Sequence, residues 1–368
     1  MGLNILVCVD DVAKENLTGL VTNVEVVEKI DQNTHYKLTF MIDISNGDIA
    51  KEMESDTIPG KMISVLAMVD DNLICLVKGP VTQQEENLQH GGPGSCLHIE
   101  GEDSAHKMDG EVKFHVYDAV TDADIATKII SSNDSMTPDV EATAGSTHNE
   151  ENHSFVQRES DLSLVRSLAK RNGFHFWVTW SDTGQATGHF KSRSLDGEPV
   201  AELIVNMENN NIDCLKVIAE ATRPFQTEGN QLNLRTKETF GGTVTLNDPK
   251  LGKDGLAAVA ANKVQSMHLA PVVDDAGAMK ARSEAALRDA QWFINATCTT
   301  SLHRLGKIIR NHTVIMVQGA GTRQSGKYYV TGVKHNIDAA AYIMEVELAR
   351  NAWGNESAGS DSLLSKIF

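Results

Sequence analysis

The sequence predicts a mainly β chain with a small α+β module in its middle. Residues 1–105 and 196–353 consist largely of short alternating apolar segments separated by Gly, Pro, Asn and Asp, which is the pattern of strands and turns. Residues 106–195 instead combine two helical patterns with strand patterns. This order predicts two similar β-rich end domains that flank an α+β insertion domain. Residues 354–368 are expected to form a flexible C-terminal tail.

The first domain is predicted to contain alternating strands and a hairpin. Residues 35–44 (HYKLTFMIDI) place apolar side chains at every second position, the period of a half-buried strand. Residues 62–81 hold two apolar runs separated by Asp70, Asp71 and Asn72, which favours a hairpin. The Gly-rich stretch at 90–103 predicts a turn followed by a short strand.

The insert is expected to open with a strand and a helix. Residues 111–120 (EVKFHVYDAV) read as a strand, and a helix follows with Thr121 as its N-cap and Asp124 three residues later. The apolar face of the strand is expected to comprise Val112, Phe114 and Val116.

A second helix is predicted over residues 160–172. Its apolar face contains Leu162, Val165 and Leu168, which form the predicted core of the insertion domain. Gly173 provides the left-handed residue that ends the helix, and a strand follows over 174–180. We expect the apolar face to pack against that strand and against residues 112–117.

Strands return in the second β-rich domain. The expected elements are strands over 201–207, 214–222 and 243–247, a long helix near 276–298, and a β-meander built from the segments HTVIMVQG, GKYYVTGVKHNID and AYIMEVELARN.

Charge and cysteine content exclude several classes of protein. The chain has 50 acidic and 33 basic residues, a net charge of −17, so sequence-specific nucleic acid and anionic membranes are not expected partners. Five widely separated cysteines without a C-x-x-C motif predict neither a disulfide framework nor a zinc site, and indicate synthesis in a reducing compartment. Neither a signal peptide nor an apolar run of about 20 residues is apparent.

A glycine-rich stretch resembles a phosphate-binding loop. From Gly321 the sequence GTRQSGKY matches G-x-x-x-x-G-K, but Tyr328 stands where Ser or Thr would hold magnesium. Alternating β-formers follow Lys327, so residues 319–326 are expected to be a hairpin loop and not a nucleotide site.

No other motif predicts an active site. The segment HNEENH (148–153) offers metal-binding side chains, but its histidines are five residues apart and do not share a helix face. Glu150 and Asp161 could act as paired carboxylates, although an acidic chain contains many such pairs. We therefore expect no catalytic, cofactor-binding or metal-binding residues, no cofactor, and no enzymatic activity.

Several segments resemble the baseplate hub of contractile tails, namely the late-control gene D protein family of phages and the N-terminal part of VgrG spike proteins. The matching segments are TDADIATKII, HSFVQRESDLSLVRSLAKRNGFHFWV, GHF at 188–190, QSGKYYVTGVKHNID and YIMEVELARN. The resemblance extends over roughly residues 1–353. It implies two similar barrel-like tube domains flanking the α+β insert, in a ring-forming homotrimer.

The resemblance also implies a function. Three copies would present six similar tube domains, so the hub would be a structural adaptor that joins a hexameric tail tube to a trimeric central spike. Its expected partners are the tail tube or a tube-initiator protein, a separate spike protein, and tape-measure and wedge proteins. It would be made in the cytoplasm of a bacterial host and reside in the tail baseplate of a virion or phage-like particle. The alternatives are a tail-associated, cell-wall-degrading hydrolase, a secretion-system spike component, or an unrelated β protein.

The chain departs from the VgrG pattern near its C-terminus. Only 15 residues follow Trp353, too few for a fused needle, so the resemblance implies that the spike is a separate polypeptide. The last residues form an apolar helical pattern. The predicted contacts with the spike or a neighbouring subunit are Leu363, Leu364, Ile367 and Phe368.

Overall fold

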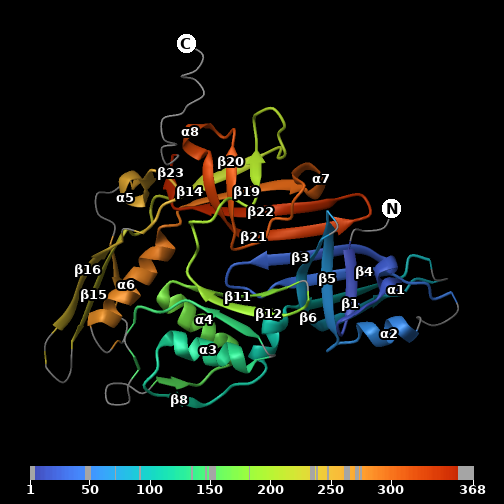
Figure 1. The fold of residues 1–368 in the computed structure, drawn as a ribbon, viewed down its shortest axis with the longest axis horizontal. Helices are drawn as coiled ribbons and strands as arrows, with labels where there is room; N and C mark the ends of the chain where they lie inside the picture. Colours follow the sequence, from blue (N-terminus) through green and yellow to red (C-terminus); the bar gives the residue numbers. More distant parts are fainter. Residues whose placement is uncertain are drawn as a thin grey trace, which may run out of the picture.

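The computed structural model has the predicted fold class: mainly β, with an α+β insert between two β-rich parts (Figure 1). It describes residues 5–354 apart from 46–50, 71, 91–92, 134–135, 146, 149–154, 182, 233–236, 238, 247, 261–265, 270–272 and 274–275. In Figure 1 a long sheet occupies the upper right, two helices lie below it, and a smaller sheet with one helix lies to the left.

The first part of the chain is almost entirely strand. Its elements are β1 (Ile5–Val9), β2 (Val12–Ala13), α1 (Glu15–Leu20), β3 (Val21–Lys29), β4 (His35–Met41), α2 (Lys51–Thr57), β5 (Met62–Val69), β6 (Asn72–Asn87) and β7 (Cys96–Glu102). The predicted hairpin is confirmed, because β5 pairs antiparallel with β6 and Val69 is opposite Asn72.

The middle part contains the two predicted helices. Its elements are η1 (Ser104–Asp109), β8 (His115–Tyr117), α3 (Asp122–Ser132), β9 (Thr137–Val140), β10 (Phe155–Gln157), α4 (Asp161–Asn172), β11 (His175–Trp180) and β12 (Ala186–Lys191). Thr121 and Asp124 form the predicted capping box at the start of α3. Gly173 ends α4 in the left-handed region at φ 69°, also as predicted.

The last part returns to strands. Its elements are β13 (Glu202–Ile204), β14 (Leu215–Ala219), β15 (Gln226–Leu232), β16 (Thr239–Thr245), β17 (Asp254–Gly255), α5 (Leu256–Val259), β18 (Ser266–Leu269), α6 (Ala276–Ala290), β19 (Ile294–Ser301), α7 (Leu302–Leu305), β20 (Val314–Gln318), α8 (Gly321–Gln324), β21 (Gly326–Asp338), β22 (Tyr342–Arg350) and β23 (Ala352–Trp353). The helix expected near 276–298 is too long, because residues 294–301 form β19. Their alternating burial and repeated threonines suit a strand better than a helix.

One thirteen-stranded sheet contains strands from both the first and the last part of the chain. Its strand order is β14-β19-β22-β21-β3-β4-β7-β6-β5-β1-β2, with β20 attached to β21 and β13 attached to β20. The two parts join where β3 pairs antiparallel with β21, with Val26 opposite His335. Among the described strands the path is open, with β2 and β14 at its ends, and does not close into a barrel.

Two main cores follow from this arrangement. The larger core combines buried side chains from both ends of the chain, including Tyr36 and Phe40 of β4 with Phe293 and Tyr328 from the last part. The second core belongs mainly to the insert and receives only Leu66, Cys75 and a few partly buried side chains from the first part. A separate lobe packs α6 against β15 and β16.

The predicted packing of the strand at 111–120 is wrong. Only His115–Tyr117 form β8, and the apolar side chains expected to be buried are exposed: Val112 by 73%, Phe114 by 72% and Val116 by 40%. The opposite face contributes Tyr117 to the core, where its hydroxyl donates a hydrogen bond to Gln157 Oε1. Because side chains alternate along a strand, burying Tyr117 turns the other three outward.

Among the described residues, no helix combines the length and the apolar character needed to span a bilayer.

Candidate functional site

The stretch that resembles a phosphate-binding loop connects two strands. β20 pairs antiparallel with β21, and their connection includes the four-residue helix α8. Lys327 lies on β21 opposite Met316, and its Nζ atom is 3.4 Å from the carbonyl oxygen of Gly197. In a phosphate loop a helix begins at the Gly-Lys pair, whereas here Gly326 and Lys327 begin the strand β21. The predicted hairpin is therefore confirmed.

In the HNEENH segment the structure describes His148, and neighbouring side chains hold the His148 ring in place. His148 Nε2 lies 2.7 Å from Asp122 Oδ1, and its ring stacks on Phe155 at a centroid distance of 4.5 Å. Arg171 also contacts both His148 and Asp122. Glu150, Glu151 and His153 lie outside the described residues. Among the residues that are described, no cluster of three or more His, Cys, Asp or Glu side chains could hold a metal ion.

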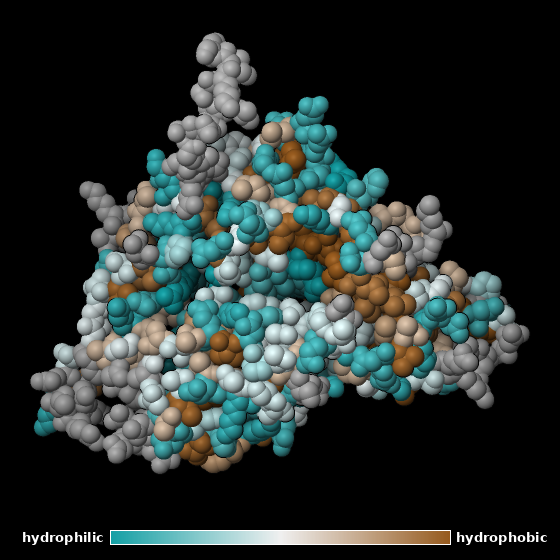
Figure 2. All heavy atoms as spheres, in the orientation of Figure 1, coloured by the Kyte–Doolittle hydropathy of each residue, from teal (hydrophilic) through white to brown (hydrophobic). Residues whose placement is uncertain are grey.

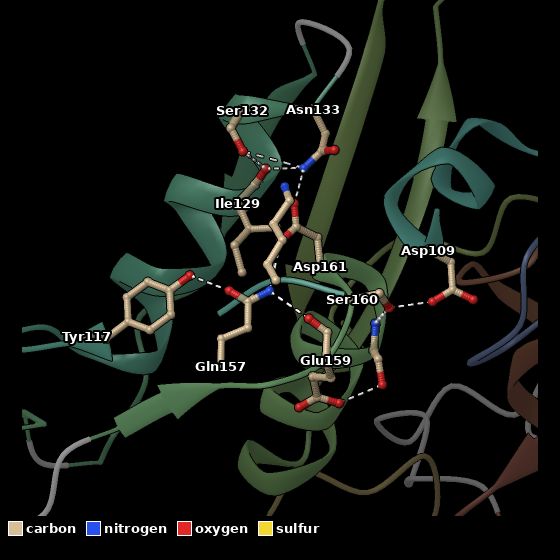
Figure 3. A network of polar contacts seen from close by, with 11 residues as sticks. Asp109, Tyr117, Ile129, Ser132, Asn133, Gln157, Glu159, Ser160 and Asp161 are labelled. Atoms are coloured by element: carbon tan, nitrogen blue, oxygen red, sulfur yellow. Dashed lines mark hydrogen bonds and ion pairs between the residues drawn. The ribbon is translucent and has the colours of Figure 1, made fainter. Parts of the chain in front are cut away.

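The segment VQRESD builds a polar network at the start of α4 (Figure 3). Asp161 accepts hydrogen bonds from Lys113 Nζ at 2.5 Å, Asn133 Nδ2 at 3.0 Å and Gln157 Nε2 at 3.0 Å. Gln157 in turn accepts from the Tyr117 hydroxyl at 3.0 Å. These contacts tie α4 to the end of α3 and to the segment that contains β8.

The other members of the segment hold the helix terminus. Ser160 is the N-cap of α4: its hydroxyl accepts the Ser163 amide at 3.2 Å and donates to Asp109. The Ser163 hydroxyl donates to Glu159 Oε2 at 2.6 Å. Ser160 thus satisfies a backbone donor of the first turn, which stabilises a helix by about 1 kcal/mol.

The environment of Asp161 suits a permanently charged carboxylate. Burial raises the pKa of this group, but hydrogen bonds from Lys113, Asn133 and Gln157 outweigh burial and leave the pKa below its ordinary value. A catalytic acid requires a pKa close to the working pH. Asp161 therefore has the properties of a structural anchor.

The predicted insert core residues lie on the inner face of α4. Leu162, Val165 and Leu168 are all buried and belong to the second core, together with Phe176 and Val178 of β11. α4 also packs against α3, η1 and α6.

A buried ion pair joins the first part of the chain to the last part. Glu28 of β3 is 1% exposed and pairs with Arg310, which lies in the turn before β20. Arg310 also donates to the carbonyl oxygens of Cys75 at 2.7 Å and Leu76 at 2.9 Å, both on β6. Burial raises the pKa of Glu28, but the Arg310 charge and other contacts outweigh it and keep the pKa below its usual value. Sequence patterns did not indicate this pair, because its members are 282 residues apart.

Aromatic and histidine rings join the insert to the last part of the chain. Trp177 of β11 stacks on His312 with centroids 3.7 Å apart and planes 6° apart, and on His189 of β12 at 4.7 Å and 18°. His312 lies in the turn before β20 at φ +57°, and its Nδ1 atom is 3.0 Å from the Tyr329 hydroxyl.

Arg193 lies beside this stack and contacts both the insert and the last part of the chain. Its Nε atom donates to His175 Nε2 at 3.1 Å, and its guanidinium lies 4.2 Å from the centre of the Trp292 ring. His175 Nδ1 lies 2.8 Å from Asp31 Oδ1, which belongs to the first part of the chain. We refer to the following residues as the histidine junction: His175, Trp177, His189, Arg193, His312 and Tyr329. Its sequence signal was weak: His175 and Trp177 alternate with Phe176 and Val178 in FHFWVTW.

The surface has exposed apolar side chains and a small cavity beside β8 and α3. A hollow of about 130 Å³ is lined by His115, Val116, Tyr117, Ile125, Lys128 and neighbouring residues, below the 300–1,000 Å³ of typical ligand sites. Figure 2 shows apolar atoms gathered over the sheet near β3 and β5, on the right of the view. The exposed large apolar side chains of the first part are Val12, Leu20, Met41, Ile58, Met68 and Leu88.

The predicted tail contacts Leu363, Leu364, Ile367 and Phe368 lie outside the described residues.

Solved structures of tail proteins share this fold over nearly the whole chain. The tail protein from Neisseria meningitidis MC58 superposes with a TM-score of 0.67 at 13% identity, covering 95% of this chain and 97% of that one. The prophage MuSo2 43 kDa tail protein from Shewanella oneidensis gives 0.65 at 13% identity, covering 94% and 98%. The E. coli c3393 protein is a type VI secretion system component with structural similarity to the T4 bacteriophage tail proteins gp27 and gp5. It gives 0.56 at 12% identity, covering 90% and 73%.

Sequence comparison identifies the family. No curated protein matches the chain. Residues 4–339 match the model of one family, described as the Alg8 N-terminal domain. This match covers most of the chain, from the start of β1 to the turn between β21 and β22. The chain therefore belongs to the Alg8 N-terminal domain family.

Proposed function

We propose that this protein is the structural baseplate hub of a contractile phage tail or of a phage-like injection particle. In this role it is a homotrimeric adaptor between a hexameric tail tube and a trimeric central spike. The observation that carries the proposal is the fold shared with the Neisseria meningitidis and Shewanella oneidensis tail proteins, over at least 94% of this chain and 97% of theirs. A match of this extent includes both β-rich parts and the insert, and so the whole architecture on which the adaptor role depends.

The layout of the chain supports a trimer. We assign residues 1–105 and 196–353 to two tube domains, 106–195 to the insertion domain and 354–368 to a tail. Three copies then supply six β-rich units around a central axis, which suits a sixfold tube on one side and a threefold spike on the other. The open ends of the sheet at β2 and β14 leave strand edges available at both ends of the path.

The exposed apolar side chains of the first part are suited to contacts between subunits. Met41 and Met68 are 60% and 45% exposed on β4 and β5, whose other faces belong to the core. A permanent assembly of this kind buries on the order of 2,000–5,000 Å² per interface. Exposed methionines are suited to such contacts because their flexible side chains adapt to a partner surface.

The partners follow from the proposed position. One face would bind the tail tube or a tube-initiator protein, and the other a separate spike protein, with tape-measure and wedge proteins nearby. Leu363, Leu364, Ile367 and Phe368 are proposed to contact the spike or a neighbouring subunit. The protein would be made in the host cytoplasm and incorporated into the baseplate. No catalytic step is proposed for it, and the three hydrogen bonds that Asp161 accepts support a structural role for that carboxylate.

The symmetry of the assembled particle tests this function. A cryo-electron microscopy reconstruction is expected to contain three copies of the chain between tube and spike, each contributing two β-rich units to one ring. Six copies or a single copy would overturn the proposal. Mass measurement of the purified chain, alone and with tube and spike proteins, separates the hub from the alternative of a hydrolase acting as a monomer.

A further inference from the structure

The histidine junction holds together parts of the chain that lie far apart in sequence. Trp177 and His189 belong to the insert, whereas His312 and Tyr329 belong to the last part. The stack is close and nearly parallel, so a small displacement of His312 would separate the two surfaces. This contact is therefore sensitive to the state of a single imidazole ring.

The surroundings of His312 favour its neutral form. Its Nδ1 atom faces the Tyr329 hydroxyl, and its buried Nε2 atom has no hydrogen-bond partner among the described residues. A protonated ring would carry an N–H at both positions, and the one at Nε2 would be buried without an acceptor. Burial and the nearby His175, Arg193 and His189 all lower the pKa of His312 well below its ordinary value.

The charged groups around the junction add mainly positive charge near His312. Arg193 follows β12 and stacks on Trp292 and Tyr329, and His175 of β11 accepts its Nε–H. Because Nε2 of His175 accepts this hydrogen bond, its Nδ1 atom carries the hydrogen that faces Asp31.

The carboxylates near the junction already have other partners. Asp31 bonds to His175, and Asp139 of β9 pairs with both His189 and Lys191 of β12. The negative charge of Asp289, near the end of α6, favours the charged form of Arg193. None of these carboxylates forms an ion pair with His312 in the described part of the chain, so a proton on that ring would have no close counter-charge.

We propose that the histidine junction is an acid-sensitive contact, which holds the insert against the last part of the chain while His312 is neutral and loosens when His312 is protonated. Opening exposes the ring to water, where a histidine has a pKa of about 6.5. The opened state therefore takes up a proton below that pH and the closed state does not. Consequently the contact is strongest above about pH 6.5 and weakens as the pH falls.

Hydrogen exchange on the full chain measures this effect. Peptides covering 174–191 and 310–330 are compared at pH 7.5 and 5.5, after correction for the intrinsic exchange rate. One proton taken up only by the opened state raises the opening equilibrium about tenfold between these pH values. Peptides from β4 (residues 35–41), which is separated from β21 by β3 in the sheet, serve as the internal reference and are expected to show no such change.

Two histidine variants identify the responsible group. His312→Asn removes the titrating ring, and Asn is chosen because it tolerates the left-handed backbone conformation found here. It is expected to abolish the tenfold change, whereas His303→Asn, at an exposed position on α7, should retain it. A variant with Asn at 312 that keeps the full pH dependence would overturn the proposal. If that variant does not fold, the wild-type chain still decides, since equal protection at both pH values also overturns it.

Discussion

Arg310 reaches across the sheet to pair with Glu28, a residue 282 positions earlier in the chain, and donates two further hydrogen bonds to carbonyls of β6. One guanidinium thus joins two strands of the first part, β3 and β6, to the segment that precedes β20. The pair is almost inaccessible to water on the Glu28 side, so neither member can lose its partner without a large cost.

Replacing Arg310 with Leu is expected to destabilise the folded chain by about 3–5 kcal/mol, because Glu28 would remain buried with only the Asn311 amide and His335 beside it. Lys334→Met is the matched control, since Lys334 of β21 forms a partly exposed pair with Glu25 on β3, the strand that also contains Glu28. Loss of that pair should cost at most about 1 kcal/mol. If both substitutions lower the free energy of unfolding in urea by the same amount, Arg310 does not stabilise Glu28 in the way described.

Replacing Leu168 with Ala tests the core of the insert. Leu168 is fully buried in the second core, so truncation should cost about 2–5 kcal/mol. Val116→Ala, at a position 40% exposed on β8, should change stability by less than about 0.5 kcal/mol. Chemical denaturation measures both, and a loss below about 1 kcal/mol for the Leu168 variant would contradict its assignment to the core.

The Asp161 network should make the insert sensitive to strong acid. The folded pKa of Asp161 is lowered, so the unfolded chain binds a proton more readily and the stabilisation is lost as the pH falls below about 4. Asp161→Asn should be less stable than wild type at pH 7, with a smaller further loss between pH 5 and 2. Unfolding measured at several pH values checks this, and an unchanged slope in the variant would argue against the network.

The net charge of −17 predicts a predominantly negative bore in the proposed ring. An acidic wall repels a polyanion over about 8 Å at physiological salt, so neither single-stranded nor duplex DNA should bind the isolated hub. An electrophoretic mobility-shift assay with labelled DNA and the purified trimer at physiological salt measures this binding. Tight binding, or a bore lined by Lys and Arg in the reconstruction, would favour a role in gripping nucleic acid.

Deletion of residues 361–368 tests the proposed tail contact. The truncated chain should still form the trimer, because the large sheet and both main cores lie within residues 5–354. It should retain the spike less well in a pull-down, because Leu363, Leu364, Ile367 and Phe368 are removed. Retention equal to that of the full chain would exclude the contact, while a polar substitution of the same four residues separates side-chain effects from length.

Local signals in the sequence predicted local structure well. The capping box at Thr121, the left-handed stop at Gly173 and the hairpin after Val69 each depend on neighbouring residues, and all three are present. The family resemblance rested partly on VQRESD, and the structure gives that segment a physical purpose in the Asp161 network.

Contacts between distant segments could not be predicted in this way. Alternation showed that Val112, Phe114 and Val116 share a face, but only the position of Tyr117 decided which face is buried. Likewise, the pairing of β3 with β21 and the stack of Trp177 on His312 depend on how separate parts of the chain meet. A single sequence shows composition and hydrophobic periodicity, whereas these contacts depend on the topology of the folded chain.

The pairing of β3 with β21 also determines when the protein can finish folding on the ribosome. Lys29, the last residue of β3, precedes Gly326, the first residue of β21, by 297 positions. At typical rates of synthesis of 5–20 residues per second, this separation corresponds to about 15–60 s. During that time the first domain has an unpaired edge at β3, which is a template for pairing with another nascent chain. Slow synthesis or crowded polysomes should therefore favour exchanged pairs, in which β21 of one chain completes the sheet of another.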